Sequence, residues 1–194
     1  MIGQKVRFTQ KHNNEEWPIM NTMLKFLPNN AFIKKELEKI FRIAKETKCA
    51  VAFWGKDGSQ IFRNSKSKNI KIVCNLTSGS TNPVEISKLQ NKYGKNSIRM
   101  KNDLHAKVFW TDKAVIIGSA NVSANGLALE GPETTGLEEV AVLIRDPIIL
   151  KQTESWFNHI WKRAMPINRI HLDDARKIWH NLAQPGDRCK LVNF

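Results

Sequence analysis

The sequence lacks any apolar run of about 18 residues, the length an apolar helix needs to cross a bilayer. Its opening residues, MIGQKVRFTQKHNNEEW, contain no apolar segment of the kind found in secretory signals. Its three cysteines, Cys49, Cys74 and Cys189, are odd in number and lack the spacing of metal ligands. We therefore expect a reduced, cytoplasmic protein with no membrane span, rather than a secreted, disulfide-stabilised one.

Patterns typical of metal and nucleotide sites are also missing. No set of His, Cys and carboxylate residues has metal-ligand spacing, so we expect no metal and no other cofactor. There is no G-x-G-x-x-G pattern, and after the glycine-containing stretch 131–136, Leu137 stands where a P-loop lysine would be needed. We reject a nucleotide-binding loop on this ground.

Positive charge, by contrast, is abundant. The chain of 194 residues carries 31 Lys and Arg against 18 Asp and Glu, a net charge of +13, and residues 1–97 carry 18 of the bases against 7 of the acids. Such a charge favours a polyanionic partner, either nucleic acid or an acidic membrane surface. The densest basic segment, residues 63–71, is either a solvated loop or a phosphate-binding surface. The uneven charge favours the second, so we expect nucleic acid to be bound by Arg63, Lys66, Lys68 and Lys71.

Apolar patterns alternate between strand and helix along the chain. Short apolar runs predict strands at 49–55, 70–76, 97–100, 104–110, 114–118 and 139–144. Helical spacing and capping residues predict helices at 31–47, 83–93, from 147 to the proline at 166, and at 173–182. We expect an α/β fold, a mixed β-sheet flanked by helices on both faces, in a single domain spanning 1–194 with C-terminal helices at about 147–183 packing on it.

One stretch, HAKVFWTDKAVIIGSAN at 105–121, concentrates polar groups among apolar strands. Strand alternation puts His105 and Lys107 on one face and Ala106, Val108 and Trp110 on the other. Burying a lysine without a charge partner is costly, and an anionic ligand would remove that cost.

The stretch ends in the turn 118–121, Gly-Ser-Ala-Asn. Small residues there would let a phosphate approach the backbone N–H groups at the start of a short helix, and Asn121 can donate through its amide. By itself this turn is more typical of an ordinary strand-to-helix turn with an Asn cap. Its combination with H-x-K-x4-D rarely arises by chance, and this favours a phosphate site.

H-x-K-x4-D followed by G-S-x-N resembles the signature of the phospholipase D superfamily, and the single motif is similar to its nuclease-type members. The resemblance covers about residues 31–144 and departs at one point, since five residues separate Asp112 from Gly118 where the usual pattern has six. It implies a phosphodiesterase that works without a metal. It also implies that His105 is the nucleophile, forming a phosphohistidine, and that Lys107 and Asn121 hold the phosphoryl oxygens.

The resemblance gives supporting roles to other residues. Asp112 would be structural, and Ser119 and Ser123 would make polar contacts around the site. A carboxylate usually orients the histidine, and we expect Glu139 in this role, with Glu138 as the alternative. Strand alternation allows only one of these two to face the site.

The reaction also needs an acid for the leaving oxygen, and histidine is the natural one near neutral pH. The other histidines are poor candidates. His12 lies in a polar N-terminal stretch, and three others lie in the helical C-terminal third without a companion lysine or glycine turn: His159, His171 and His180. Single-motif members of the family that the chain resembles assemble as homodimers, so the resemblance implies a homodimer joined through the active-site face, in which a second His105 is the acid.

Three functional hypotheses follow. The first is a metal-independent DNA endonuclease, including a restriction-type enzyme, acting through a phosphohistidine in a homodimeric site; RNA is a less favoured substrate. The second is a phospholipase or phosphatidyltransferase of the same superfamily. The third is a nucleic-acid-binding module without catalysis, which the complete His, Lys and Asn set argues against.

Overall fold

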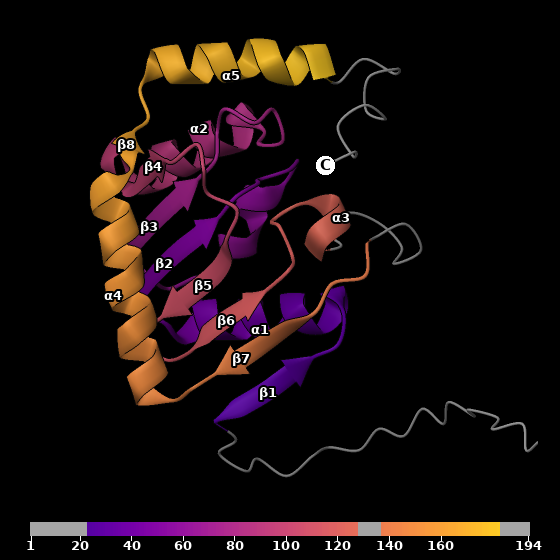
Figure 1. Cartoon of the computed structure of the whole chain (residues 1–194), viewed down its shortest axis with the longest axis vertical. Coiled ribbons are helices and arrows are strands. Elements are labelled where there is room, and N and C mark those ends of the chain that lie inside the picture. The colour runs from indigo at the N-terminus through magenta and orange to yellow at the C-terminus, as the bar shows by residue number, and fades with distance from the viewer. Residues whose placement is uncertain (1–22, 128–136, 183–194) are drawn as a thin grey trace, which may run out of the picture.

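A mixed sheet of eight strands lies at the centre of the computed structural model, which describes residues 23–127 and 137–182 (Figure 1). The strand order is β1-β7-β6-β5-β2-β3-β4-β8. The strands are β1 Leu24–Leu27, β2 Glu46–Val51, β3 Asn69–Cys74, β4 Ile98–Met100, β5 Lys107–Thr111, β6 Val115–Gly118, β7 Ala141–Ile144 and β8 Met165–Pro166. Among the paired strands of the described residues, β2–β3 and β3–β4 are parallel and the other pairs are antiparallel.

Helices cover both faces of this sheet, which confirms the predicted fold class. They are α1 Asn30–Ile43, α2 Pro83–Tyr93, α3 Ala124–Leu127, α4 Pro147–Arg163 and α5 Arg169–Leu182, with 3-10 turns η1 Gly58–Phe62 and η2 Lys95–Ser97. Side chains of α1, α2, α3 and α5 join the core on one face, and α4 packs on the other. Within the described ranges, no helix is long and apolar enough to cross a membrane.

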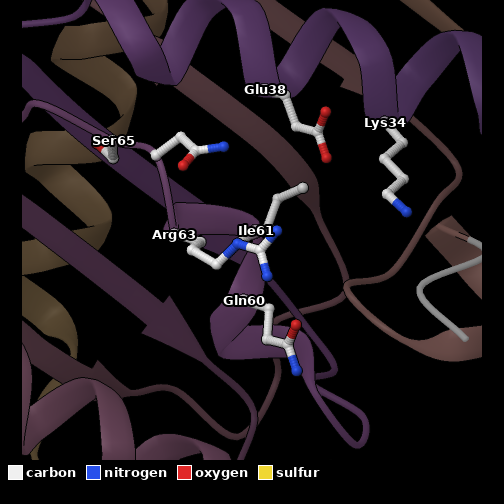
Figure 2. Close-up of a pocket in the computed structure, with 7 residues that line it drawn as sticks. Lys34, Glu38, Gln60, Ile61, Arg63 and Ser65 are labelled. Atoms are coloured by element: carbon white, nitrogen blue, oxygen red, sulfur yellow. The ribbon is translucent and has the colours of Figure 1, made fainter.

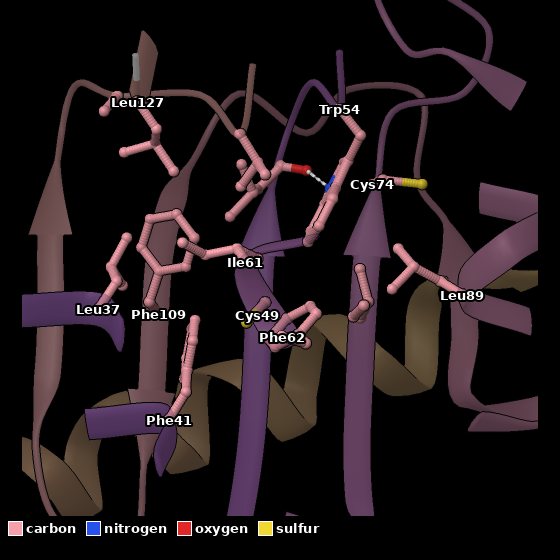
Figure 3. Close-up of a cluster of buried hydrophobic side chains, with 14 of the residues drawn as sticks. Leu37, Phe41, Cys49, Trp54, Ile61, Phe62, Cys74, Leu89, Phe109 and Leu127 are labelled. Atoms are coloured by element: carbon pink, nitrogen blue, oxygen red, sulfur yellow. Dashed lines mark hydrogen bonds between the residues drawn. The ribbon is translucent and has the colours of Figure 1, made fainter. Parts of the chain in front are cut away.

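The larger core lies between the sheet and α1, where aromatic rings interlock (Figure 3). Phe41 of α1 packs against Phe62 of η1 with ring centroids 4.9 Å apart, and against Phe109 of β5 at 6.4 Å. Just beyond β2, Trp54 is fully buried, and its Nε1 donates to the carbonyl of Val51 at 3.1 Å. The buried indole therefore anchors the segment that leaves the sheet after β2.

On the other face, α4 covers only part of the sheet. Phe157 of α4 joins Val108 and Trp110 in a second core cluster, as predicted for the apolar side of β5. A row of paired residues crosses the sheet from β5 through β6 and β7 to the edge strand β1. Along this row the exposed fraction of the residue rises from 7% at Val108 to 39% at Ile117 and 63% at Phe26. The sheet face over β6, β7 and β1 is thus apolar and uncovered by the described helices.

Several boundaries differ from the sequence prediction. β2 ends at Val51 rather than residue 55, because Trp54 leaves the sheet and forms an isolated parallel bridge with Val122. β5 begins only at Lys107, so His105 precedes the strand. The edge strands β1 and β8 were not predicted; β1 has three exposed residues out of four, so it lacks the alternation that signals a half-buried strand.

Candidate active site

The motif residues meet at one edge of the sheet, where β2 and β6 end and β5 and β7 begin. His105 lies just before β5, and Lys107 is the first residue of that strand. Asn121 follows the end of β6, and Glu139 precedes β7. Antiparallel pairing of β5, β6 and β7 brings these separate segments to the same edge.

A direct contact joins His105 and Lys107. The lysine Nζ lies 3.0 Å from Nε2 of His105 and 2.9 Å from its backbone carbonyl oxygen. An ammonium can only donate, so Nε2 accepts, and a neutral His105 then carries its proton on Nδ1. The imidazole is exposed, whereas Lys107 is only 9% exposed.

Burial lowers the pKa of Lys107 below that of an ordinary lysine, because desolvation disfavours the ammonium. The carboxylate of Glu139 opposes this effect by attracting the positive charge, without cancelling it. Glu139 therefore offsets only part of the cost of burying the Lys107 ammonium, and a phosphate at the site would supply further negative charge.

Glu139 is 7% exposed and accepts a hydrogen bond from the hydroxyl of Ser119. The same hydroxyl oxygen accepts from the N–H of Val140 at 3.2 Å, which fixes Ser119 against the start of β7. Glu138 is exposed instead, so the two adjacent carboxylates differ in burial as strand alternation requires. Within the described protomer, no hydrogen bond joins Glu139 to His105.

The amide of Asn121 is oriented by a residue that the sequence analysis missed, Phe53. The backbone N–H of Phe53 faces Oδ1 of Asn121 at 3.3 Å. A backbone N–H can only donate, so the oxygen is engaged and the two N–H donors of Asn121 are left for a ligand. The ring of Phe53 also lies edge-on to His105, with centroids 5.8 Å apart. An aromatic residue at the end of a buried run was the available signal, but such residues usually belong to the core.

The backbone cradle was predicted at 118–121 and at the start of the helix that follows. Three N–H groups in this region already donate to carbonyl oxygens: Ser119 to Val140 at 3.0 Å, Val122 to Phe53 at 3.2 Å and Ser123 to Asn121 at 3.0 Å. The Ser123 hydroxyl accepts from the N–H of Gly126 at 3.0 Å and so caps α3. Side chains, rather than these amides, are left to hold a phosphate.

Gly118 has a packing role rather than the expected one of admitting a phosphate. A Cβ built at this position would lie 2.5 Å from the Cβ of Ala141 and 2.5 Å from the carbonyl oxygen of Val140. The missing side chain therefore makes room for the backbone of β7.

Asp112 lies at the far end of β5 from His105. Its Oδ1 accepts from the N–H groups of Lys45 at 2.9 Å and Glu46 at 3.4 Å, and its Oδ2 lies 3.2 Å from Nζ of Lys113. Partial burial would raise the pKa of Asp112, but these donors outweigh it and hold the pKa below the ordinary value. Asp112 therefore ties the β5–β6 turn to the start of β2.

The four basic residues predicted to bind nucleic acid do not border this site. Lys66 and Lys68 flank Ser67, whose hydroxyl donates to the carbonyls of Lys45 and Asn69, where β2 and β3 begin. His105 lies at the opposite edge, where β2 ends. Lys71 in β3 lies on the α4 side, its Nζ 5.6 Å from the ring centroid of Trp161.

Arg63 also lies apart from the motif residues. It lines a cavity of about 120 Å³ between α1 and η1, opposite Lys34 and Glu38 (Figure 2). The polar ends of these side chains face one another across the cavity. None of the lining residues belongs to the phosphate motif.

The other histidines stay separate from His105 in the described chain. His159 is exposed on α4 and His180 on α5, while Nδ1 of His171 accepts from the N–H of Asn168 at 3.3 Å. His12, Cys189 and the stretch 131–136 lie outside the described residues. Among the residues described, no group of three or more His, Cys, Asp or Glu could hold a metal ion.

Comparison with known proteins places this geometry in a family. The family model described as "Cardiolipin synthase, PLD-like domain" matches residues 56–161, more than half of the chain and all of the motif residues. The chain belongs to the phospholipase D-like family. It is thus a member of a superfamily of phosphodiesterases, as the motif predicts.

Solved structures agree on the fold. NucT from Helicobacter pylori has a TM-score of 0.57 at 21% identity, covering 74% of this chain and 97% of its own. Phosphatidylserine synthase of Haemophilus influenzae Rd KW20 has a TM-score of 0.61 at 17% identity, covering 84% of this chain but 44% of its own. Nuc from Salmonella typhimurium, a phospholipase D family member, has a TM-score of 0.51 at 18% identity, covering 75% and 96%. Among curated protein sequences, none matches the chain.

Proposed function

We propose that this protein is a metal-independent phosphodiesterase that cleaves DNA through a phosphohistidine at His105. The observation that carries the proposal is the contact between the Lys107 ammonium and Nε2 of His105, 3.0 Å apart at an exposed edge of the sheet. A nucleophile and a phosphate-binding cation are thereby adjacent, with the free donors of Asn121 held nearby through Phe53.

A phosphodiester resists attack because its negative charge repels nucleophiles. Lys107 and the amide of Asn121 would bind the non-bridging oxygens and offset that charge. As the phosphate attracts the Lys107 ammonium, the Nε2 lone pair of His105 becomes free to attack phosphorus. The new P–N bond forms as the bond to the leaving oxygen breaks, and that oxygen takes a proton from a second acid.

In the second step, water attacks the phosphohistidine and gives up a proton to the group that acted as the acid. The P–N bond breaks, the hydrolysed phosphate leaves, and His105 regains its lone pair. Glu139, buried beside Lys107 and bonded to Ser119, would keep the local charge balanced during both steps. Ser119 and Ser123 support Glu139 and the turn after β6, respectively.

The second acid would come from the His105 of another copy of the chain. The uncovered apolar sheet face next to the site supports this proposal, since Leu24, Phe26, Ile117 and Val140 are all exposed there. Two chains of charge +13 repel each other, so an apolar contact is the kind that can hold them together.

DNA is favoured over lipid by the chain's basic charge. The chain covers 97% of NucT and 96% of Nuc, but 44% of the phosphatidylserine synthase. A further neighbour, TrmBL2, is described as an archaeal chromatin protein with a novel mode of DNA binding, at a TM-score of 0.54 and 14% identity. The phosphatidylserine synthase keeps a lipid phosphodiester as the second candidate substrate.

The basic residues Arg63, Lys66, Lys68 and Lys71 would then contact the DNA backbone away from the scissile phosphate. Lys66 and Lys68 lie near the start of β2, and His105 lies near its end. The six residues of β2 separate these two positions by about 20 Å along the strand. This is less than one turn of duplex, about 34 Å, so a single bound duplex can reach both edges.

The proposal is tested by incubating the protein with DNA, RNA and phospholipid vesicles side by side in excess EDTA. We expect DNA cleavage that persists in EDTA. Cleavage of the lipid alone would support the phosphatidyl-transfer alternative. Salt-sensitive DNA binding without cleavage of any substrate would support a non-catalytic binding module.

A further inference from the structure

Phe53 lies in the segment that follows β2, outside the phosphate motif, yet it contacts three motif residues. Its N–H donates to Oδ1 of Asn121 at 3.3 Å. Its ring centroid lies 5.8 Å from that of His105 and 5.9 Å from Nζ of Lys107. One residue thus contacts the proposed nucleophile and both proposed phosphate-binding groups.

The backbone of Phe53 is held independently of its side chain. Its carbonyl accepts from the N–H of Val122 at 3.2 Å, and the N–H of Gly55 donates to the carbonyl of Val122 at 2.8 Å. The neighbouring Trp54 is fully buried. Replacing the ring of Phe53 should therefore leave the segment, and its hydrogen bond to Asn121, in place.

The ring itself acts on the other two residues. Its centroid distance to Nζ of Lys107 lies within the range of about 6 Å at which an aromatic face attracts an ammonium. Its plane makes an angle of 63° with the imidazole of His105, an edge contact that limits rotation of that ring. His105 is exposed and precedes β5, so it gains little restraint from the sheet.

We propose that Phe53 is a positioning residue for the His105–Lys107 pair. Its ring holds the Lys107 ammonium close to His105, where an incoming phosphate can reach it, and holds the imidazole in the orientation from which Nε2 attacks phosphorus once the phosphate draws the ammonium away. This role rests on the proposed phosphodiesterase function. Phe53 takes no part in bond making, and its effect is transmitted through the two side chains that it contacts.

The kinetic test replaces the ring while keeping the residue apolar. For Phe53→Leu we expect kcat on DNA to fall about tenfold, with KM and DNA affinity within about twofold of the wild type. Phe53→Tyr keeps the ring and should restore kcat to within about threefold. Phe32→Leu removes a half-exposed ring on α1 and is the matched control, with no expected change.

A spectroscopic test needs no activity. In the wild type at a pH where His105 is neutral, ¹⁵N NMR should show a protonated Nδ1 and an acceptor Nε2. In Phe53→Leu both shifts should move toward the averaged values of a histidine that exchanges between tautomers, and in Phe53→Tyr they should not move. If the wild type cuts no DNA, the nuclease proposal fails while this measurement still decides the role of Phe53. Unchanged His105 shifts in Phe53→Leu, a loss confined to KM, or a tyrosine that fails to restore kcat would overturn the proposal.

Discussion

Nζ of Lys107 lies 3.0 Å from Nε2 of His105, so the cation that would bind phosphate occupies the lone pair that would attack it. In the absence of a substrate, this contact would cover the proposed nucleophile. A phosphate that bound the ammonium and drew it away would expose Nε2. The proposed mechanism therefore links substrate binding to activation of the histidine, and in it the charge on Lys107 is central to the reaction.

Removing the nucleophile should abolish cleavage but not binding. For His105→Ala we expect the rate of DNA cleavage to fall by roughly 10³-fold or more, because no other described histidine lies beside a lysine in this site. DNA affinity measured by fluorescence anisotropy should stay within about threefold, since the basic residues are unchanged. His159→Ala, at an exposed position on α4, is the control; retained cleavage by His105→Ala would move the nucleophile elsewhere.

Lys107 should lose its proton at a pH below 10.5, the ordinary lysine value, because burial disfavours the ammonium. Its pKa is lowered on folding. Between the pKa of Lys107 in the folded protein and the ordinary value of 10.5, the unfolded chain therefore binds more protons than the folded one. The free energy of unfolding should rise with pH over this range. Activity should fall over the same pH range as the phosphate-binding charge of Lys107 is lost.

Glu139→Gln removes the carboxylate that favours the ammonium and should lower the pKa of Lys107 further, while the exposed Glu138→Gln should leave that pKa unchanged. ¹⁵N NMR of the Lys107 Nζ measures the pKa of Lys107 in each protein. A wild-type Lys107 that titrates at 10.5 or above would contradict the expected lowering of its pKa by burial.

Asn121→Asp separates the two ends of the amide. The aspartate can still accept the N–H of Phe53, so the turn should stay folded. It has no donor for the phosphate and adds a negative charge, so kcat should fall by roughly 10²-fold with little change in melting temperature. Asn91→Asp, on the exposed side of α2, is the control for added charge. A variant with near-normal kcat would remove Asn121 from the phosphate-binding groups.

Gly118→Ala tests the packing role of the motif glycine. The new Cβ would lie 2.5 Å from the Cβ of Ala141 and 2.5 Å from the carbonyl oxygen of Val140, so β6 and β7 must separate. We expect a loss of about 1–3 kcal/mol in the free energy of unfolding, measured in urea. The exposed Ser155→Ala on α4 should change it by less than about 0.5 kcal/mol. A Gly118→Ala protein as stable as the wild type would show that the strands adjust freely.

A site shared by two chains predicts a particular result on mixing. If both copies of His105 are needed, a mixed dimer of wild type and His105→Ala is inactive. Cleavage per wild-type chain should then fall to about half at equal mixing and about one-tenth at ninefold excess of the variant. Mixing with His159→Ala should cause no loss. Cleavage per wild-type chain that stays constant after subunit exchange would place a complete site within one chain.

The dimer surface has its own test. Ile117→Lys puts a charge on the uncovered sheet face next to the site and should yield a folded, inactive monomer by size-exclusion chromatography with light scattering. Val84→Lys, on the exposed side of α2, should leave the oligomeric state unchanged. A dimer that persists in Ile117→Lys would exclude this face as the contact.

The sequence predicted the fold class from the alternation of strand and helix patterns. It predicted that His105 and Lys107 lie together because they are two residues apart, although His105 precedes β5. Alternation also required that only one of Glu138 and Glu139 face the site, and the two differ in burial accordingly. The last two predictions needed only residues that are close in sequence.

Other features required knowledge of how distant segments meet. Phe53 reaches the site only because Trp54 is buried and bridges to Val122, a contact between segments far apart in sequence. The backbone N–H of Ser119 donates to the carbonyl of Val140, just before β7, and that of Val122 donates to the carbonyl of Phe53; the motif alone reveals neither contact. Lys66 and Lys68 were predicted to bind nucleic acid, but the sequence did not show that they lie at the opposite end of β2 from His105, where the chain returns because β3 runs parallel to β2.

The most direct measurement is the mass of the His105-containing peptide after a DNA cleavage reaction, run in excess EDTA, is stopped with denaturant. We predict a nucleotide joined through phosphorus to His105, present in the wild type and absent in His105→Ala. Cleavage that stops in EDTA, or an adduct on a residue other than His105, would contradict a metal-independent phosphohistidine mechanism.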